Sequence, residues 1–173
     1  IESWSLKDDG VQAIRAGLCK TYRRGRRAME TAIEAPSGEA FHEWRKRVKY
    51  TGYHMRLLGP VWPGVIPAIE NEFAALSDLL GEEHDLAVFR AAITADPGRF
   101  GSADAVLAMI GRRRSELRAM VAPMGRRLYA EGPRRWTRRL GVAWMSWESL
   151  RTIDGVMKED PAAVMDAAAG AGG

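Results

Sequence analysis

The segment FHEWRKRVKY, which begins at Phe41, carries five side chains that are basic or histidine and only one acid. On an α-helix each residue advances by about 100°, so the basic residues of this region fall on one stripe. Basic residues three and four positions apart lie about 5–6 Å from one another and donate charge-assisted hydrogen bonds to phosphate oxygens. The spacing therefore predicts a ladder of donors for a polyanion. The stripe consists of His42, Arg45, Lys46, Lys49, Tyr53 and Arg56.

The opposite side of the same helix is expected to be buried in a core. Glu43 lies between the two faces, so no acid of this helix falls within the basic stripe. A plainly solvated face is the alternative, because charged residues are mostly exposed in any protein. The apolar side carries Phe41, Trp44, Val48, Thr51, Met55 and Leu58.

A second basic cluster, YRRGRRAME, begins at Tyr22. Tyr22 belongs to the apolar stripe of its helix, whereas Arg23, Arg26 and Arg27 stand beside that stripe or away from it. A glycine in mid-helix costs about 0.5–1 kcal/mol relative to alanine. Gly25 therefore indicates a close helix crossing or, as the weaker alternative, a ligand that approaches the backbone.

Hydrophobic periodicity indicates helices along almost the whole chain, and strand-like alternation is absent. Ser37 is expected to cap the second helix, Gly81 to separate the third from the fourth, and Ser102 to cap the fifth. Short loops between such helices favour an all-α, antiparallel helical bundle. The expected helices run over about 7–34, 38–58, 66–80, 82–93, 103–130 and 134–150, the last being shorter than the fifth.

Two later groups are interpreted as structural. The run of arginines from 112 to 114 is expected to be solvated or to connect helices. Trp136, Trp144 and Trp147 are expected to pack in the bundle or to dock against a partner.

The bulk properties describe a basic domain. The 173 residues suffice for one domain, and the net charge of +4 with a pI of about 9.5 reflects arginine clusters that attract polyanions. Cys19 is the only cysteine, which favours a reducing compartment and hence the cytoplasm. No signal peptide is apparent, and no apolar run reaches the roughly 18 residues that a membrane span needs. We expect a helical domain over residues 1–158 and a disordered, low-complexity tail over 159–173; the first residue, Ile1, indicates a trimmed chain.

The stretches FHEWRKRVKYTGYHMRLL and LLGEEHDLAVF together resemble the CHAD domain, the conserved histidine α-helical domain. TYRRGRRAM and GRRLYAEGPRRWTRRLGVAW are also similar to that family, so the resemblance spans residues 11–147. It implies two helical bundles related by pseudo-symmetry, with basic and histidine side chains lining a positively charged cavity. It also implies binding of inorganic polyphosphate, association with polyphosphate granules and, often, a neighbouring triphosphate-tunnel (CYTH) catalytic domain. The family is not known for catalysis.

The resemblance implies candidate binding residues in both stretches, FHEWRKRVKYTGYHMRLL and LLGEEHDLAVF. The usual first-half motif, His-x-x-Arg-x-x-x-Arg-Arg, is absent, so the chain resembles the C-terminal half with an extension. A separate N-terminal half or a second copy is then an expected partner. Gly52 stands where many members have a bulky or basic residue. The matching positions are His42, Arg45, Lys46, Lys49, His84 and Asp85, with Tyr22, Arg23, Arg26 and Arg27 on the preceding helix.

The leading hypothesis is a polyphosphate-binding module that is not an enzyme and needs no cofactor. Three alternatives stay open: a nucleic-acid-binding domain, a metal site that uses His42, His54 and His84, and a plain interaction bundle. The expected polyphosphate contacts are His42, Arg45, Lys46, Lys49, Arg56, Tyr22, Arg23, Arg26, Arg27 and His84.

Overall fold

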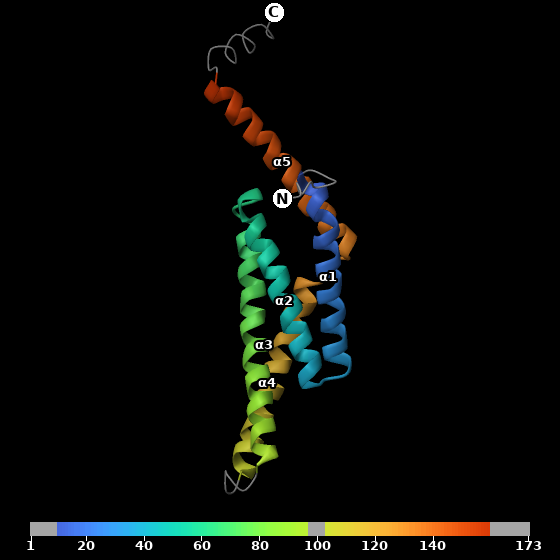
Figure 1. The fold of residues 1–173 in the computed structure, drawn as a ribbon, viewed down its shortest axis with the longest axis vertical. Helices are drawn as coiled ribbons and strands as arrows, with labels where there is room; N and C mark the ends of the chain where they lie inside the picture. Colours follow the sequence, from blue (N-terminus) through green and yellow to red (C-terminus); the bar gives the residue numbers. More distant parts are fainter. Residues whose placement is uncertain (1–9, 97–102, 160–173) are drawn as a thin grey trace, which may run out of the picture.

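The computed structural model describes residues 10–96 and 103–159 (Figure 1). Within those ranges the chain forms five α-helices and one short 3₁₀ helix and contains no strand, which confirms the all-α class. The elements are α1 (Gly10–Glu34), α2 (Gly38–Leu58), η1 (Gly59–Val61), α3 (Ile66–Ala95), α4 (Asp104–Leu128) and α5 (Pro133–Glu159).

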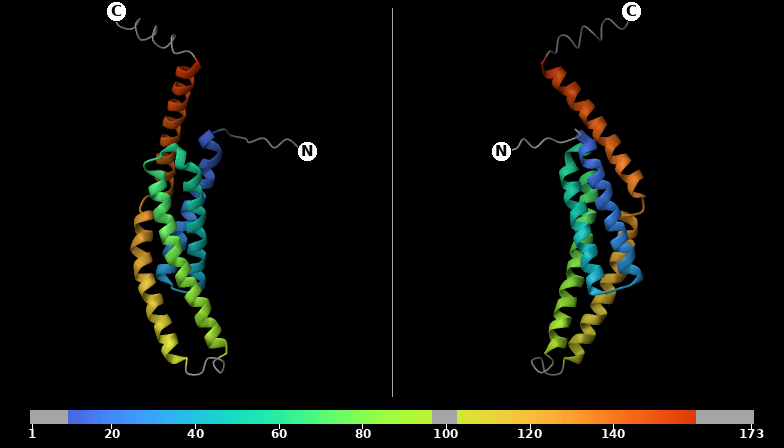
Figure 2. Two further views of the ribbon diagram at one scale, coloured as in Figure 1. Left: turned by 90° about the vertical axis from the view of Figure 1, so that its left-hand side faces the viewer. Right: turned by 45° about the vertical axis from the view of Figure 1, so that its right-hand side comes forward.

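The helices form an elongated antiparallel bundle in which α2 has a central position. It packs against α1 on one side and α3 on the other, while α4 lies along α3 (Figure 1). The first part of α5 packs against α1, and its last part extends beyond the end of the bundle (Figure 2). Because α2 touches both neighbours, its outward stripe is bordered by α1 and by α3.

Aromatic side chains from α1, α2, α3 and the first part of α5, with Tyr129 directly after α4, hold the bundle together. Tyr22 of α1 stacks on Trp136 of α5 at 4.2 Å between ring centroids and meets Tyr129 edge-on at 5.0 Å. Phe73 of α3 packs on Tyr129 from the other side, and Trp44 of α2 is fully buried. The apolar face expected for α2 is confirmed, because its six members are the residues of α2 that are buried: Phe41, Trp44, Val48, Thr51, Met55 and Leu58.

The expected cap of α2 is also confirmed. Ser37 has an extended backbone, and its hydroxyl oxygen accepts a hydrogen bond from the Ala40 N–H at 3.1 Å. This bond satisfies one of the amides that a helix start leaves without a partner. The expected start near residue 7, the cap at Ser102 and the tail from 160 onward lie outside the described residues.

Two expectations about helix lengths are wrong. Gly81 does not separate two helices, since α3 is continuous from Ile66 to Ala95. Gly81 is buried beneath α2, where an added Cβ would lie 3.2 Å from a guanidinium nitrogen of Arg45. Close packing on α2 thus overrides the weak helix propensity of glycine. The last helix is also longer than expected, because α5 has 27 residues and α4 has 25.

The three tryptophans of α5 have different environments. Trp136 is only 3% exposed and belongs to the core. Trp144 and Trp147 are half-buried and meet edge-on at 5.5 Å. Trp147 lines an apolar groove of about 810 Å³ between η1 and α5, together with Trp62. Packing in the bundle is therefore confirmed for all three, because Trp136 belongs to the core and Trp144 and Trp147 pack against it.

Gly25 marks a close crossing between α1 and the end of α4. A Cβ added there would lie 2.8 and 2.9 Å from ring atoms of the buried Tyr129, far inside normal contact distance. We expect Gly25→Ala to destabilise the fold by about 1–3 kcal/mol, despite the gain in helix propensity, because the ring has no free space to enter.

Gly17 provides the matched control on the same helix, since nothing lies within 4 Å of its added Cβ. Gly17→Ala should stabilise the protein by about 0.5–1 kcal/mol. Urea unfolding followed by circular dichroism compares the two variants. Equal stability of the two would contradict the close crossing.

Candidate anion-binding surface

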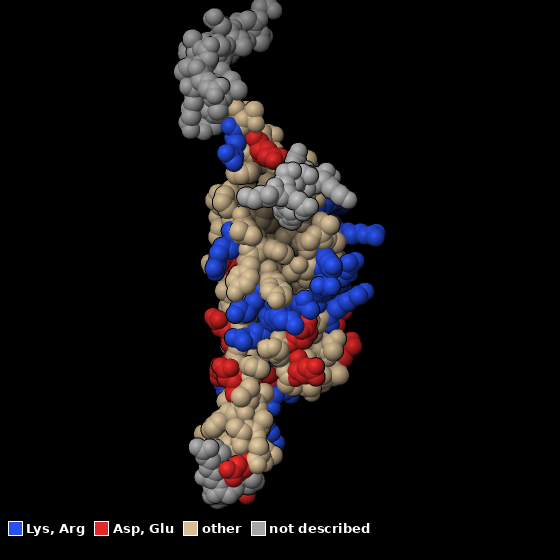
Figure 3. Space-filling view, viewed as in Figure 1, with Lys and Arg blue, Asp and Glu red and all other residues tan. Residues whose placement is uncertain are grey.

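The outward stripe of α2 lies on a face where Lys and Arg side chains gather. Figure 3 shows them as a band that crosses α2 and α1, with acidic side chains below the band in this view. His42, Lys46 and Lys49 are exposed, and Arg45 is half-buried. Tyr53 is 48% exposed, so the stripe also presents an aromatic ring to solvent.

Within α2 the stripe is partly neutralised by Glu43. This carboxylate contacts the Lys46 ammonium at 2.6 Å and the Arg47 guanidinium at 2.5 Å. Hydrogen bonds from Lys46 and then from Arg47 lower the pKa of Glu43. The expectation that α2 leaves its whole ladder without a counter-charge is therefore wrong at Lys46. Side chains three and four residues apart on a helix can meet even when they belong to different faces.

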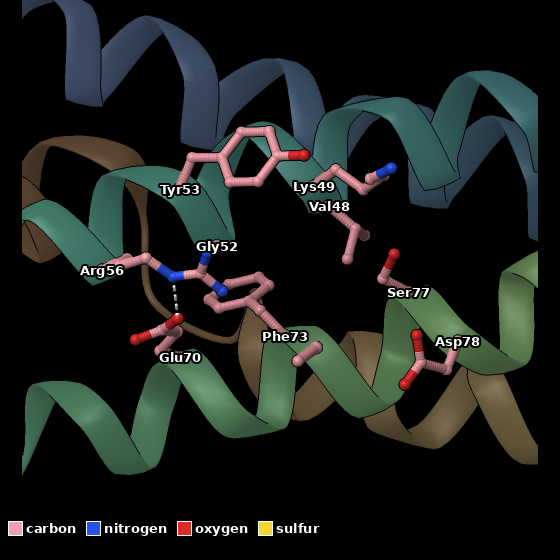
Figure 4. Close-up of a pocket in the computed structure, with 10 residues that line it drawn as sticks. Val48, Lys49, Gly52, Tyr53, Arg56, Glu70, Phe73, Ser77 and Asp78 are labelled. Atoms are coloured by element: carbon pink, nitrogen blue, oxygen red, sulfur yellow. Dashed lines mark hydrogen bonds and ion pairs between the residues drawn. The ribbon is translucent and has the colours of Figure 1, made fainter.

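Arg56 is neutralised by α3. Its Nε donates to Glu70 at 2.7 Å (Figure 4), and this hydrogen bond raises the pKa of the guanidinium. Glu70 lies 14 residues further along the chain, on another helix, so helical periodicity within α2 does not reveal it. Arg56 is thus not a free cation, which corrects its place in the expected binding set.

A small cleft of about 140 Å³ separates α2 from α3 beside this pair. Lys49 and Tyr53 contribute from α2, and Ser77 and Asp78 contribute from α3 (Figure 4). Among the described residues Lys49 has no ion pair within 4.0 Å. This edge of α2 therefore combines a free ammonium with a carboxylate on the facing helix.

Arg45 faces the same row of acids. It lines a groove of about 560 Å³ together with Asp78, Glu82 and Asp85 of α3. Its guanidinium packs on Gly81, and its Nε is buried without a hydrogen-bond partner among the described residues. The α3 acids were missed as neighbours of the stripe. Their spacing of three and four residues indicates a common face of one helix. The position of that face beside α2, however, depends on how the helices pack.

Two of the three α1 arginines in the expected binding set are free guanidinium groups. Arg23 and Arg27 are exposed and have no ion pair among the residues that the structure describes. Arg26 differs, since its Nε contacts Glu30 at 3.0 Å. Of the expected α1 contacts, Arg23 and Arg27 therefore stay candidate cations, and Arg26 is partly neutralised.

Tyr22 is a core residue, which removes it from the expected binding set. It is fully buried, and its hydroxyl donates to the backbone oxygens of Leu128 at 3.0 Å and Glu131 at 3.2 Å. Burial raises its pKa to about 12. The aromatic ring belongs to the apolar stripe of α1, so the hydroxyl serves packing between helices and cannot reach a surface ligand.

The two histidines of the matching motifs lie together. The rings of His42 on α2 and His84 on α3 have centroids 4.5 Å apart. His54 lies in a separate apolar cavity with Leu18 and Trp144. No group of three His, Cys, Asp or Glu side chains within 10–96 and 103–153 is placed to hold a metal ion. The alternative of a metal site built from all three histidines is therefore contradicted, because His54 lies apart from His42 and His84.

The environment of His54 gives stability a pH dependence. Burial lowers its pKa below the usual value of about 6.5, so below that value the unfolded chain binds more protons than the folded one. Its contribution to stability is present above about pH 6.5 and is lost as the pH falls. We expect His54→Phe, which keeps an aromatic ring in the cavity, to reduce the loss of stability between pH 7.5 and 5.5. Urea midpoints at the two pH values measure this, and an equal loss in both proteins would contradict it.

A buried carboxylate connects α3 to α4. Glu83 is fully buried, and its Oε1 accepts hydrogen bonds from Arg114 and Arg118 of α4, each at 2.7 Å from Nη2. The neighbouring Glu82 accepts from Arg113 at 2.6 Å. Contacts between helices are therefore confirmed for two members of the 112–114 run. Within the EEHD motif, Glu83 therefore acts in packing, whereas Glu82 forms an ion pair at the surface.

Comparison with protein families gives a match to the CHAD domain over residues 4–94. The matched region covers α1, α2, η1 and nearly all of α3, and it ends before α4 and α5. Comparison with curated proteins and with solved structures gave no match. Among the described residues no helix is long and apolar enough to cross a membrane.

Proposed function

We propose that this chain, which belongs to the CHAD domain family, binds inorganic polyphosphate along α1 and α2. The family is known for binding polyphosphate. The observation that supports the proposal most directly is that three of the expected contacts on adjacent helices are exposed and have no acidic partner among the described residues: Arg23, Arg27 and Lys49. We propose that the domain holds the polymer without changing it chemically.

The chemistry of the side chains suits this ligand. Polyphosphate carries about one negative charge for each phosphate unit, and basic side chains one helical turn apart lie about 5–6 Å from each other. Arginine can form two parallel hydrogen bonds to a phosphate group, and lysine adds a compact charge. Successive cations on two helices can therefore contact successive or alternate units of one chain.

Lys46 can join these contacts in spite of its ion pair. Its carboxylate partner, Glu43, also contacts Arg47 and would keep that partner if Lys46 turned toward a phosphate. Exposed ion pairs contribute only about 0–1 kcal/mol, so the exchange costs little. His42, at the start of α2, is the further donor on this side.

The acids of α3 direct the polymer toward α1. Asp78 and Asp85 line the groove beside Arg45, and a polyanion there would meet like charge. We therefore assign Arg45 and His84 to the acidic edge. The contacts are placed on His42, Lys46, Arg23 and Arg27, and on Lys49, whose ammonium is exposed and has no ion pair among the described residues although Asp78 lines the same cleft. Cytoplasmic location, association with polyphosphate granules, and completion of the site by a separate N-terminal half or a second copy follow as further proposals.

A pull-down with immobilised long-chain polyphosphate tests the proposal. The protein should be retained at low ionic strength and released progressively as salt is added, because each phosphate contact displaces a counterion. Absence of retention at low salt, or retention that salt does not affect, would refute it.

Single-stranded nucleic acid is the second candidate. Tyr50 and Tyr53 are 45% and 48% exposed on α2, and exposed aromatic rings beside basic residues can stack on bases. Competition at fixed ionic strength distinguishes the two ligands. Polyphosphate should displace a fluorescent single-stranded oligonucleotide from the protein, and Tyr50→Ala with Tyr53→Ala should leave polyphosphate binding unchanged. A large loss of polyphosphate binding in that variant, or failure of polyphosphate to compete, would favour nucleic acid.

A further inference from the structure

A stripe of mostly apolar side chains runs along α5 from the groove beside η1 toward the last part of the helix. Val142, Ser146 and Leu150 line that groove, and Ile153 follows at the same helical spacing. We call these four residues the α5 stripe. Val142, Leu150 and Ile153 are 57%, 64% and 59% exposed. The stripe therefore presents apolar surface to solvent along the helix that extends beyond the bundle (Figure 2).

The groove beside η1 has aromatic walls. Trp147 lines it from α5, and Trp62 and Pro63 line it from the residues directly after η1. Trp62 is 42% exposed. Arg139 is the only charged residue among the described residues that line the groove, and it already contacts Glu131 at 3.7 Å. Such walls suit the apolar face of a helix, and the far end of the α5 stripe is a face of this kind.

The two ends of this chain fit the groove poorly. The segment before α1 joins the bundle on the other flank of α5, because Val11 lies beside Gly141, and Gly141 is roughly opposite Leu150 around the helix. The segment after α5 is rich in alanine and glycine. Its only apolar side chains larger than proline are Val164 and Met165, which are too few to fill a groove of about 810 Å³. The occupant is therefore expected to come from another molecule.

The charges of α5 favour a second α5 helix in the antiparallel direction. The first half of the helix, 133–144, carries four arginines and no acid, whereas the second half, 145–159, carries three acids and two bases. The second half also contains the negative end of the helix dipole. Antiparallel pairing places each basic half beside the more acidic half of the other helix, whereas parallel pairing would place the arginines together.

We propose that two copies of this chain form a two-fold symmetric dimer in which their α5 helices pair antiparallel. An axis beside Trp147 would place Ile153 of one copy over Val142 of the other, and the reverse, because both lie about five to six residues from the axis. The α5 stripe thus supplies both the occupant and part of the groove that receives it. The proposal does not depend on the binding of polyphosphate.

The contact has the size of a moderately stable interface. Pairing over residues 139–156 would extend for about 27 Å, and at a helix diameter of about 10 Å it would bury on the order of 500 Å² on each copy, the wall at Trp62 included. A specific interface needs a total of about 1,000 Å². We therefore expect a dimer with a dissociation constant of roughly 1–100 µM.

Sedimentation velocity of the full chain between about 1 and 100 µM tests the proposal. Leu150→Gln with Ile153→Gln should weaken self-association by about 30-fold or more, because each removed side chain is lost from both copies. Val106→Gln with Met109→Gln is the matched control, since these α4 side chains are 41% and 61% exposed and neither lines the groove. Circular dichroism checks that all variants keep their helices. A chain that is monomeric throughout this range leaves the groove to a different partner and overturns the proposal, as does equal weakening by the two pairs.

Disulfide trapping tests the direction of pairing. In a Cys19→Ser background, which removes the only cysteine of the chain, Val142→Cys with Ile153→Cys should give covalent dimers on mild oxidation. Ile153→Cys alone should not, because the two copies of this position would lie about 16 Å apart along the paired helices, beyond the reach of a disulfide. Equal trapping by the single and the double variant would show parallel pairing and overturn the antiparallel arrangement.

Discussion

Replacing Lys46, Lys49, Arg23 and Arg27 with glutamine is expected to weaken the binding of long-chain polyphosphate by roughly 30- to 1000-fold at low salt. Each exposed contact is worth about 0.5–1 kcal/mol, and four such contacts sum to about 2–4 kcal/mol. The slope of affinity against salt concentration should also become shallower, because fewer counterions are displaced. Titration with fluorescently labelled polyphosphate at several salt concentrations measures both effects.

Three controls make this result specific to the surface. Arg56→Gln removes a charge from the same helix, but Glu70 already neutralises that guanidinium, so binding should change by less than about threefold. Tyr22→Phe should leave binding unchanged and reduce stability by about 1 kcal/mol, because its hydroxyl bonds are buried. The pair Lys46→Gln and Lys49→Gln should weaken binding more than Arg90→Gln and Arg112→Gln. If these two charge-matched pairs behave alike, net charge alone explains binding and the surface is not a site.

Glu83→Gln is expected to destabilise the protein by about 3–5 kcal/mol. The carboxylate is fully buried between Arg114 and Arg118, which are themselves only 16% and 29% exposed. Removing its charge leaves two partly buried guanidinium groups without a counter-charge, which is more costly than the net contribution of the ion pairs. For a domain of this size the melting temperature should fall by roughly 6–20 °C. Urea and thermal unfolding measure both quantities.

The adjacent residue provides the control for that variant. Glu82 pairs with Arg113 at the surface, and Glu82→Gln should cost no more than about 1 kcal/mol. A triple variant, Glu83→Leu with Arg114→Met and Arg118→Met, should recover most of the lost stability, because an apolar cluster can replace a buried ionic one. Similar losses for Glu82→Gln and Glu83→Gln would show that burial of Glu83 has no energetic consequence.

The pattern of α2 was predictable because it is local. Every residue expected on its apolar face is buried, and Ser37 caps the helix as expected, since helical periodicity and capping depend only on neighbours a few positions away. The close crossing at Gly25 was also indicated by the sequence. A glycine in the middle of a helix lowers the stability of that helix, so its presence there indicates a close contact that a larger side chain would prevent. Its partner, Tyr129, directly follows α4, and the sequence alone could not identify it.

The continuation of α3 through Gly81 was not predictable from the same rules. Glycine usually weakens a helix, and only the approach of Arg45 from α2 explains why this one is retained within α3. Glu83 is a similar case. The acids near His84 suggested ligands or a helix cap, and the partners that make Glu83 structural, Arg114 and Arg118, lie 31 and 35 residues away.

By itself the sequence determined the all-α class, the core face of α2 and the outward direction of its charges, because these follow from spacing within one helix. Only the tertiary structure decided which charges remain free. Glu70 reaches Arg56, the acids of α3 border Arg45, and Arg23 and Arg27 stay without partners in the described chain. An ion pair requires two atoms within about 4 Å, and between helices that distance is set by packing rather than by position along the chain.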